Sequence, residues 1–361
     1  MAQRIDLLIN SLRGGGAEKV CTTIANGLIE QGFEVNLIVI DLNKAVYLNR
    51  LHANVNLVNL ETKRARSSFS ALLKYVNKYE PEKMLVFNYE LTFISLFARA
   101  ISKKRFHIIS RSINTLSEVN KEDSSQVKKT FKNFLVKKIY SKANLIIAQS
   151  EGMKGDLVKN IKIPSKKIEI IHNPIDFNIL KKTLKDDYKK STDFLFIGRL
   201  ETQKNLFQLL DAFRLCLIEV PNLKLRLVGE GSLKDELIAY SSVIKIEENV
   251  QIDSFVEDVI PVYKSAKVTV LSSNYEGFPN VLLESIVLGT PVVSYDCPSG
   301  PAEIIKDKEN GFLVENGNVE MLAEKMLKAL DFNWNKEKLI KSMEQFMPLN
   351  IILKYVNIIT K

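Results

Sequence analysis

Residues 275–284 read YEGFPNVLLE, and they come shortly after the apolar run Val-Thr-Val-Leu at residues 268–271. The apolar run predicts a buried strand. Gly277 lets the backbone approach a ligand without a side chain in the way. Pro279 is typical of the first turn of a helix, where its missing N–H has no partner to lose. The stretch therefore predicts a strand, a loop and then a helix that begins near Asn280.

Two carboxylates, Glu276 and Glu284, stand eight residues apart in this stretch, one on the loop and one inside the helix. The first backbone N–H groups of a helix lack intrahelical partners and form a binding site for anions. One ligand could therefore meet an anion cradle and two carboxylates that accept hydrogen bonds from hydroxyl groups. A sugar nucleotide carries both phosphate and hydroxyl groups, so the stretch indicates a site for a sugar nucleotide.

Around this stretch, short apolar segments alternate with amphipathic ones. The alternation is typical of strands and helices that build parallel sheets covered on both faces. We therefore expect an α/β protein with two doubly wound, Rossmann-like domains that face each other across a cleft. Ligands of such sheets bind at the carboxyl ends of the strands. The expected strands are 4–10, 35–40, 54–60, 83–87, 106–110 and 144–148, then 193–197, 223–228, 250–252, 267–271 and 291–295.

The length of 361 residues is more than one core of ordinary size supports and suits two domains. A polar, lysine-rich segment at 176–191 separates the two series of strands and predicts a linker. We expect an N-terminal domain at 1–175, a C-terminal domain at 192–345, and a last helix at 346–361 that packs back toward the N-terminal domain.

Composition excludes several classes of protein. Hydrophobic residues make up 46% of the chain and charged residues 26%, which is typical of a globular protein. We find no apolar run long enough for a membrane-spanning helix and no signal-peptide pattern before Asp6. Cys21, Cys216 and Cys297 lie far apart, and with three histidines they give no zinc spacing. We therefore expect a protein of the reducing cytoplasm without a zinc site of His and Cys.

The net charge of +9 is concentrated in the first 180 residues. A basic half can attract nucleic acid, an anionic membrane or a phosphate-bearing substrate. Residues 128–142 contain six lysines and no acid, and the spacing predicts Phe131, Phe134, Leu135 and Ile139 on one face of a helix. This helix either lies on an anionic membrane or packs on the core with a solvated lysine face. The residues expected to meet the acceptor or the membrane are Lys63, Arg64, Arg66, Lys128, Lys132 and Lys138.

Other short motifs stand at expected strand ends. Gly14, Gly15 and Gly16 follow the first strand, where they form either a phosphate cradle or a simple turn. Gly198 and Arg199, with Lys204 beyond them, follow the first strand of the second domain, where the cations could hold a diphosphate. Gly229 follows the next strand.

We expect different environments for His107 and Arg111, which lie in and just after the fifth expected strand. His107 lies among apolar strand residues, so we expect it to be buried. Arg111 lies just past the expected strand end and is the better candidate for a ligand contact.

In order and spacing, these motifs resemble the retaining glycosyltransferases of family 4, which have the glycosyltransferase B (GT-B) fold. The resemblance covers essentially the whole chain. Its most specific part is the pair Glu276 and Glu284 within EGFPNVLLE. The other matching pieces are GGAE at 15–18, HNP at 172–174, GRL at 198–200 with Lys204 and Asn205, and VGEG at 228–231.

The resemblance implies a role for each matching residue. Arg199 and Lys204 would hold the donor diphosphate, Glu276 would contact the donor hexose, and Glu284 the ribose hydroxyls. Many family members have a histidine after a central N-terminal strand, and this chain has Ser110-Arg111-Ser112 there, which makes Arg111 the substitute. The further residues expected to bind the donor are Gly15, Gly16, Gly198, Gly229, Gly277, Phe278, Pro279 and Asn280.

We therefore expect an enzyme that moves a hexose or N-acetylhexosamine from a nucleotide sugar, with UDP favoured, to a lipid-linked glycan in bacterial surface polysaccharide synthesis. The resemblance also implies that the enzyme needs no cofactor and no metal. It would work on the inner face of the cytoplasmic membrane and bind no nucleic acid. A nucleotide-sugar epimerase or hydrolase of the same fold is the alternative, and a nucleic-acid-binding protein is the third reading.

Overall fold

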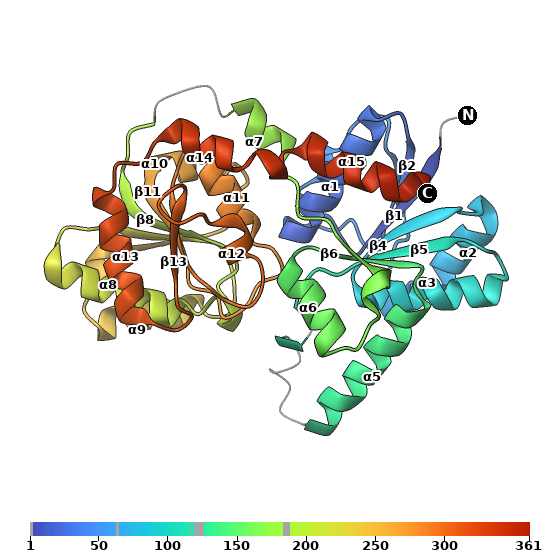
Figure 1. Cartoon of the computed structure of the whole chain (residues 1–361), viewed down its shortest axis with the longest axis horizontal. Coiled ribbons are helices and arrows are strands. Elements are labelled where there is room, and N and C mark those ends of the chain that lie inside the picture. The colour runs from blue at the N-terminus through green and yellow to red at the C-terminus, as the bar shows by residue number, and fades with distance from the viewer. Residues whose placement is uncertain (1–2, 63–64, 116, 119–125, 183–187) are drawn as a thin grey trace. The chain divides into compact units, whose positions relative to one another are not determined.

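The computed structural model describes residues 3–62, 65–115, 117–118, 126–182 and 188–361, without the side chains of residues 126–132, 181 and 182. The chain divides into two compact units (Figure 1). Unit 1 comprises Met1–Asp176 together with Phe346–Lys361, and unit 2 comprises Phe177–Gln345. Each unit has its own parallel sheet, so the expected class of two doubly wound α/β domains is confirmed.

The described sheet of unit 1 has seven strands in the order β3-β2-β1-β4-β5-β6-β7, and its paired neighbours are parallel. Its strands are β1 (Arg4–Ile9), β2 (Glu34–Val39), β3 (Asn56–Asn59), β4 (Lys83–Phe87), β5 (His107–Arg111), β6 (Leu145–Ala148) and β7 (Ile168–Ile170). Its helices are α1 (Gly16–Glu30), α2 (Phe69–Tyr79), α3 (Tyr89–Ser102), α5 (Gln126–Lys142), α6 (Glu151–Lys159) and α15 (Pro348–Thr360), with short 3₁₀ helices at Leu48–Arg50, Ala65–Ser67 and Ser165–Lys167. A further 3₁₀ helix, Glu344–Phe346, begins in unit 2 and ends with the first residue of the C-terminal segment of unit 1.

Alternation along β1 explains how helices cover both faces of this sheet. Ile5, Leu7 and Ile9 pack in one buried cluster with α1 and α15. Leu8 packs in another cluster with α2 and α3. Successive side chains of a strand point to opposite faces, so a nearly continuous apolar strand requires both layers.

The last helix belongs to the core of unit 1. A Cβ on Gly27 of α1 would lie 2.6 Å from a side-chain atom of Ile352 on α15, so glycine permits the close approach of these two helices. Ile352 and Tyr355 are buried in the cluster that also holds α1.

The described sheet of unit 2 has six strands in the order β10-β9-β8-β11-β12-β13, again parallel. Its strands are β8 (Thr192–Ile197), β9 (Leu225–Val228), β10 (Val250–Asp253), β11 (Ala266–Leu271), β12 (Val292–Tyr295) and β13 (Gly311–Val314). Its helices are α7 (Phe177–Lys182), α8 (Leu206–Glu219), α9 (Lys234–Val243), α10 (Ile260–Ser265), α11 (Asn280–Val287), α12 (Pro301–Ile304), α13 (Val319–Asp331) and α14 (Lys336–Ser342), with 3₁₀ helices at Thr202–Lys204 and Glu247–Asn249.

Each sheet has one place where its strand order reverses. In unit 1, β1 lies between β2 and β4, and in unit 2, β8 lies between β9 and β11. At such a switch point, the loops after the two central strands lead away in opposite directions and leave a crevice for a ligand.

Three features of the fold differ from the expectations. The edge strands β7 and β13 were not predicted, because β7 has only three residues and β13 begins with Gly311, a residue type that is depleted in strands. Helix α7 lies inside the segment expected to be a linker, and β5 extends through Arg111 rather than ending before it. The last difference places the Arg111 side chain within the sheet layer.

Candidate active site

The two expected cations and Glu276, the first glutamate of the Glu276/Glu284 pair, lie at the ends of the two central strands of unit 2. Arg199 and Lys204 follow β8, and Glu276 follows β11. Since β8 and β11 pair in parallel, both loops leave the same edge of the sheet. This is the edge, at the switch point, where doubly wound sheets bind ligands. We call Arg199, Gln203, Lys204, Ser273 and Glu276 the β8–β11 site.

Lys204 and Glu276 form an ion pair in which Nζ lies 2.5 Å from Oε1. The hydroxyl of Ser273 donates to the same carboxylate oxygen at 2.6 Å. The Lys204 and Glu276 side chains are only 13% and 10% exposed, so water screens this pair less than a surface pair. The site thus holds a cation and an anion next to each other, shielded from bulk solvent.

Cys297 lies near this pair. Burial raises the pKa of its thiol, and the Glu276 carboxylate raises it further, whereas Lys204 lowers it. The thiol therefore stays protonated at neutral pH and is no nucleophile.

Gln203 connects the two loops of the site and was not found from the sequence. The Arg199 guanidinium donates through Nη2 to Oε1 of Gln203 at 3.1 Å. The amide of Gln203 donates in turn to the carbonyl oxygen of Tyr275 at 2.8 Å. Gln203 therefore fixes Arg199 relative to the loop that carries Glu276, an arrangement that depends on strand pairing between residues distant in sequence.

Glu284 lies within α11, which begins at Asn280 with Pro279 as its N-cap. Glu284 is 4% exposed. The hydroxyl of Tyr263 on α10 donates to its Oε2 at 3.3 Å. The sequence predicted this helix and its start, but nothing in the sequence pointed to Tyr263.

Glycines let the loops at this edge approach one another closely. Gly229 follows β9 with φ +154°, and a Cβ there would lie 1.8 Å from the carbonyl oxygen of Gly198. On the other side, the hydroxyl of Ser299 donates to the carbonyl oxygen of Gly277 at 3.1 Å. Phe278, next to Gly277, is buried. The expected donor-binding residues of unit 2 therefore lie on loops and a helix start at one edge of one sheet.

Arg111 has a different environment from the one expected for it. Its side chain is 1% exposed, donates from Nε to the Tyr355 hydroxyl at 3.0 Å and from Nη2 to Oδ1 of Asn173, and lies 5.4 Å from the ring centre of Phe87. In this structure the guanidinium connects β5, α15 and the segment before α7. Its expected contact with the donor stays a prediction.

The glycine turn of unit 1 leads into α1. Gly15 is the N-cap of this helix, and Gly16 is its first residue. Glu18, in the first turn, accepts a hydrogen bond from the Ser11 hydroxyl at 3.0 Å. A carboxylate of the chain itself therefore lies beside this turn, where the sequence suggested a phosphate cradle.

A pocket of about 890 Å³ lies at the carboxyl edge of the unit 1 sheet, and we call it the carboxyl-edge pocket. Asn10 and Ser11 reach it from the end of β1, Asp41 from the end of β2 and Glu90 from the start of α3. Oδ1 of Asn10 is buried without a hydrogen-bond partner among the described residues. The pocket therefore offers polar groups at the switch point of unit 1, which the sequence did not reveal.

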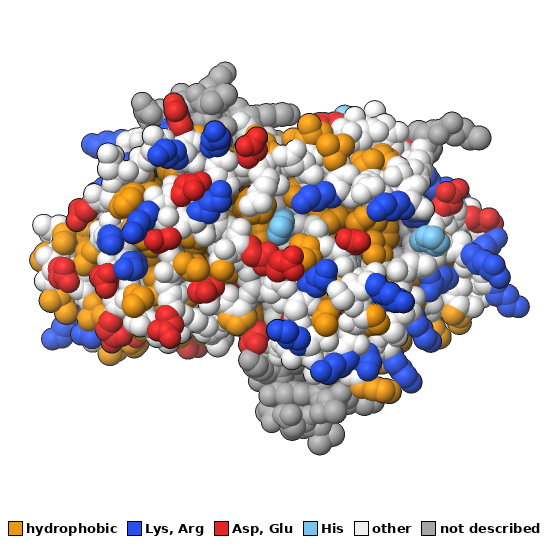
Figure 2. All heavy atoms as spheres, viewed as in Figure 1, with side chains coloured by type: hydrophobic (Ala, Val, Ile, Leu, Met, Phe, Trp, Pro, Cys, Tyr) orange, Lys and Arg blue, Asp and Glu red, His pale blue; other side chains and the backbone are white. Residues whose placement is uncertain are grey.

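The basic residues expected to meet the acceptor or membrane have mixed positions. Lys63 and Arg64 lie outside the described residues, as do the side chains of Lys128 and Lys132. Arg66 lines the carboxyl-edge pocket, and Lys138 is exposed on α5. On the face shown in Figure 2, Lys and Arg gather over unit 1, whereas in unit 2 they alternate with Asp and Glu.

One expectation about a unit 1 side chain was wrong, and another was met in part. His107 is exposed, because it is the first residue of β5 and lies outside the buried part of the strand. On α5, Phe134 and Leu135 are 54% and 41% exposed, while the core-facing residues are Val136, Ile139 and Tyr140. Leu135 and Ile139 of the predicted face both line the carboxyl-edge pocket, and the side chain of Phe131 lies outside the described residues. That the helix lies on an anionic membrane stays a prediction.

The described residues contain no group of three or more His, Cys, Asp or Glu that could hold a metal ion. None of the described helices combines the length and the apolar character needed to cross a bilayer.

Two family models together match most of the chain: "Glycosyltransferase Family 4" over residues 14–178 and "Glycosyl transferases group 1" over residues 179–346. A Campylobacter jejuni protein, N-acetylgalactosamine-N,N'-diacetylbacillosaminyl-diphospho-undecaprenol 4-alpha-N-acetylgalactosaminyltransferase, is 32% identical over 88% of this chain and 87% of its own. The Erwinia amylovora amylovoran biosynthesis glycosyltransferase AmsD is 27% identical over 88% of this chain and 86% of its own.

Solved structures agree in fold. The Anabaena HepE structure in complex with UDP and glucose has a TM-score of 0.81 at 18% identity, with 99% of each chain covered. The lipopolysaccharide outer core galactosyltransferase WaaB in its apo form has a TM-score of 0.73 at 21% identity, again with 99% of each chain covered. The chain therefore belongs to glycosyltransferase family 4 and has the GT-B fold.

Proposed function

We propose that this glycosyltransferase moves a hexose or N-acetylhexosamine from a UDP-sugar to a lipid-linked glycan in bacterial surface polysaccharide synthesis. The observation that carries the proposal is the β8–β11 site. Arg199 and the Lys204–Glu276 pair lie at the switch point of unit 2, next to the loop that leads into α11. A diphosphate and a sugar hydroxyl are the two kinds of group that such a site can bind.

The cations suit the leaving group of this reaction. Negative charge builds on the nucleoside diphosphate as the bond to the sugar breaks, and prearranged positive groups stabilise that charge. Arg199 and Lys204 would supply it together with the first amides of α11, which carry the positive end of the helix dipole. We propose that these groups take the part that a metal ion has in other phosphoryl-group chemistry.

We further propose that the configuration at the anomeric carbon is retained. The sugar would pass through an oxocarbenium-like state, and the acceptor hydroxyl would attack from the face that the diphosphate leaves. The departing phosphate would then take the proton, so no separate carboxylate base is required. Glu276 would bind the sugar hydroxyls and Glu284 the ribose.

The donor and acceptor are proposed from the relatives. UDP is bound in the solved Anabaena structure of the same fold. The Campylobacter jejuni relative carries an undecaprenol diphosphate acceptor in its name. The carboxyl-edge pocket of unit 1 is the place we propose for the acceptor glycan, because its polar groups suit hydroxyls. The basic surface of unit 1 would hold the enzyme on the inner face of the cytoplasmic membrane.

Two measurements test these proposals. A thermal-shift panel of nucleotides should show stabilisation by UDP above that by ADP or GDP, since a ligand of the native state raises its apparent stability. NMR of the product formed in the presence of EDTA should show the donor's anomeric configuration. No stabilisation by UDP, an inverted product or a strict need for added metal would each contradict the corresponding part.

A further inference from the structure

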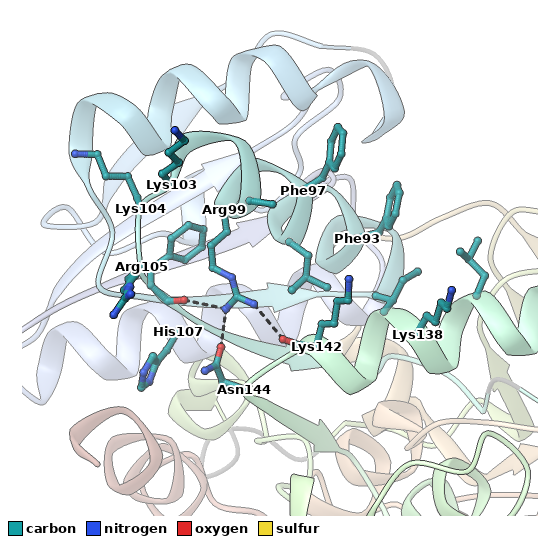
Figure 3. A pocket seen from close by; sticks show the side chains of 15 residues that line it. Phe93, Phe97, Arg99, Lys103, Lys104, Arg105, His107, Lys138, Lys142 and Asn144 are labelled. Atoms are coloured by element: carbon teal, nitrogen blue, oxygen red, sulfur yellow. Dashed lines mark hydrogen bonds between the residues drawn. The ribbon is translucent and has the colours of Figure 1, made fainter.

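A second pocket of unit 1, of about 730 Å³, lies between α3 and the end of α5. We call it the α3–α5 pocket (Figure 3). We propose that it binds an anionic phospholipid of the bilayer, with the lipid phosphate at its lysines and an acyl chain against its aromatic wall. The proposal deepens the proposed function, since it rests on an acceptor that is embedded in a membrane.

Charge is the first argument. Among the residues that the structure describes, six Lys or Arg side chains line the pocket and no carboxylate does. Lys104 is paired with Glu80. Four further cations of the pocket have no ion-pair partner among the described residues, and they are Lys103, Arg105, Lys138 and Lys142. Unbalanced cations around a concave site favour an anionic ligand.

Arg99 has a structural role in this pocket. Its guanidinium donates to the carbonyl oxygens of Phe106 and Lys142, both at 3.1 Å, and to Oδ1 of Asn144 at 2.8 Å, as Figure 3 shows. Burial lowers the pKa of Arg99. These bonds fix the end of α5 relative to the end of α3. The lysines next to Arg99 therefore extend from helix ends that are held in place.

Exposed apolar side chains are the second argument. Phe93 and Phe97 are 48% and 50% exposed on α3, and Leu135 across from them on α5 is 41% exposed. Ile101, one further helical turn along α3, is 50% exposed. Large aromatic and aliphatic groups that remain in water next to lysines are typical of surfaces that enter the boundary between lipid headgroups and acyl chains.

A bilayer supplies both chemistries at once, phosphate and hydrocarbon, whereas a nucleic acid or an acidic peptide supplies the anion without the acyl chain.

The position of the pocket supports the same occupant. The α3–α5 pocket and the carboxyl-edge pocket share Phe93, Phe97, Leu135 and Ile139 as walls. A lipid bound in the first would therefore bring the second next to the membrane that holds the acceptor.

The test uses two alanines on exposed helix surfaces. Ala100 lines the α3–α5 pocket, and Ala239 lies on α9 of unit 2. Ala100→Glu and Ala239→Glu change the net charge equally, so adsorption by overall charge would weaken equally in both. We expect Ala100→Glu to weaken cosedimentation with phosphatidylglycerol vesicles about fivefold or more, and Ala239→Glu to leave it unchanged. Wild-type protein should bind phosphatidylcholine vesicles far less.

Equal binding by the two variants, or equal binding of wild type to both vesicle types, would overturn the proposal. Ala100→Glu, Ala239→Glu and wild type should transfer sugar equally to a water-soluble, short-chain acceptor. If the wild type transfers nothing but binds phosphatidylglycerol through this pocket, the proposed function fails and the lipid site stands. If the wild type transfers sugar well and the two variants bind vesicles equally, the proposed function stands and the lipid site fails.

Discussion

The ammonium group of Lys204 lies 2.5 Å from the carboxylate of Glu276, although 72 positions separate them in the sequence. The cation proposed for the donor diphosphate and the carboxylate proposed for the donor sugar therefore neutralise each other in this structure. A donor would bring its own negative charge to Lys204 and its own hydroxyls to Glu276, and so replace the pair by two new contacts.

Removing the cation should affect turnover more than stability. We expect Lys204→Ala to lower kcat/KM for transfer by about 10² to 10³, the usual cost of losing one group that stabilises developing charge. Lys306→Ala is the matched control, because Lys306 pairs with Glu309 on the surface and is 53% exposed. Loss of activity in both variants, or in neither, would argue against a specific role for Lys204.

Gly229→Ala should destabilise unit 2. The new Cβ would lie 1.8 Å from the carbonyl oxygen of Gly198, at a φ of +154°. We expect a loss of about 1–3 kcal/mol in the free energy of unfolding, the range for overpacking. Gly155→Ala on α6 has no atom of the described residues within 4 Å of the added carbon, and we expect it to raise the free energy of unfolding by about 0.5–1 kcal/mol, as alanine does over glycine within a helix. Urea denaturation measures both, and an unaffected Gly229→Ala would contradict the close packing of the loops.

The buried contact of Arg111 with Tyr355 should stabilise unit 1. Tyr355→Phe removes one acceptor of a charged donor, so we expect a loss of about 1.5–3 kcal/mol in the free energy of unfolding. Tyr79→Phe, at an exposed position of α2, should change little. The KM of Arg111→Lys for the donor distinguishes a role in donor binding from a role in packing α15. A large rise in this KM with an unchanged free energy of unfolding would indicate that Arg111 contacts the donor.

The buried carboxylate of Asp6 should make stability depend on pH. Burial raises the pKa of Asp6. The hydrogen bond from Asn36 and the charge of Arg4 lower this pKa, but by less than burial raises it. The folded state therefore binds this proton more tightly than the unfolded state, and folding loses stability as pH rises through the acidic range. We expect Asp6→Asn to raise the free energy of unfolding at pH 7, with a gain that shrinks toward pH 4. A gain that is equal at both pH values would be contrary to this assignment.

Local patterns were enough to predict most of the fold. The strand at Lys83–Phe87 was predicted to the residue, and α11 begins at Asn280 as Pro279 indicates. These elements have continuous apolar runs or residues with strong positional preferences. The edge strand β7 was missed because three residues carry no clear period, and β13 because it begins with a glycine, which is depleted in strands.

Part of the β8–β11 site could also be predicted from local sequence patterns. Arg199, Lys204 and Glu276 are conspicuous beside glycines at strand ends, and the order of strands then places them together. Gln203 and Tyr263 could not be found, because their contacts depend on pairing between distant segments. The exposure of Phe93 and Phe97 on α3 was also hidden, since an apolar helix looks the same in sequence whether or not one face is covered.

The most direct test of the account follows label from donor to lipid. Full-length protein is incubated with a UDP-sugar labelled in the sugar and with bacterial membrane lipids, and the label in the organic phase is counted for wild type and for Glu276→Ala. We predict lipid-dependent transfer by the wild type and nearly none by the variant. Equal transfer by both, or release of free sugar by the wild type at the same rate without lipid, would contradict the claim that the β8–β11 site is the donor site of a glycosyltransferase.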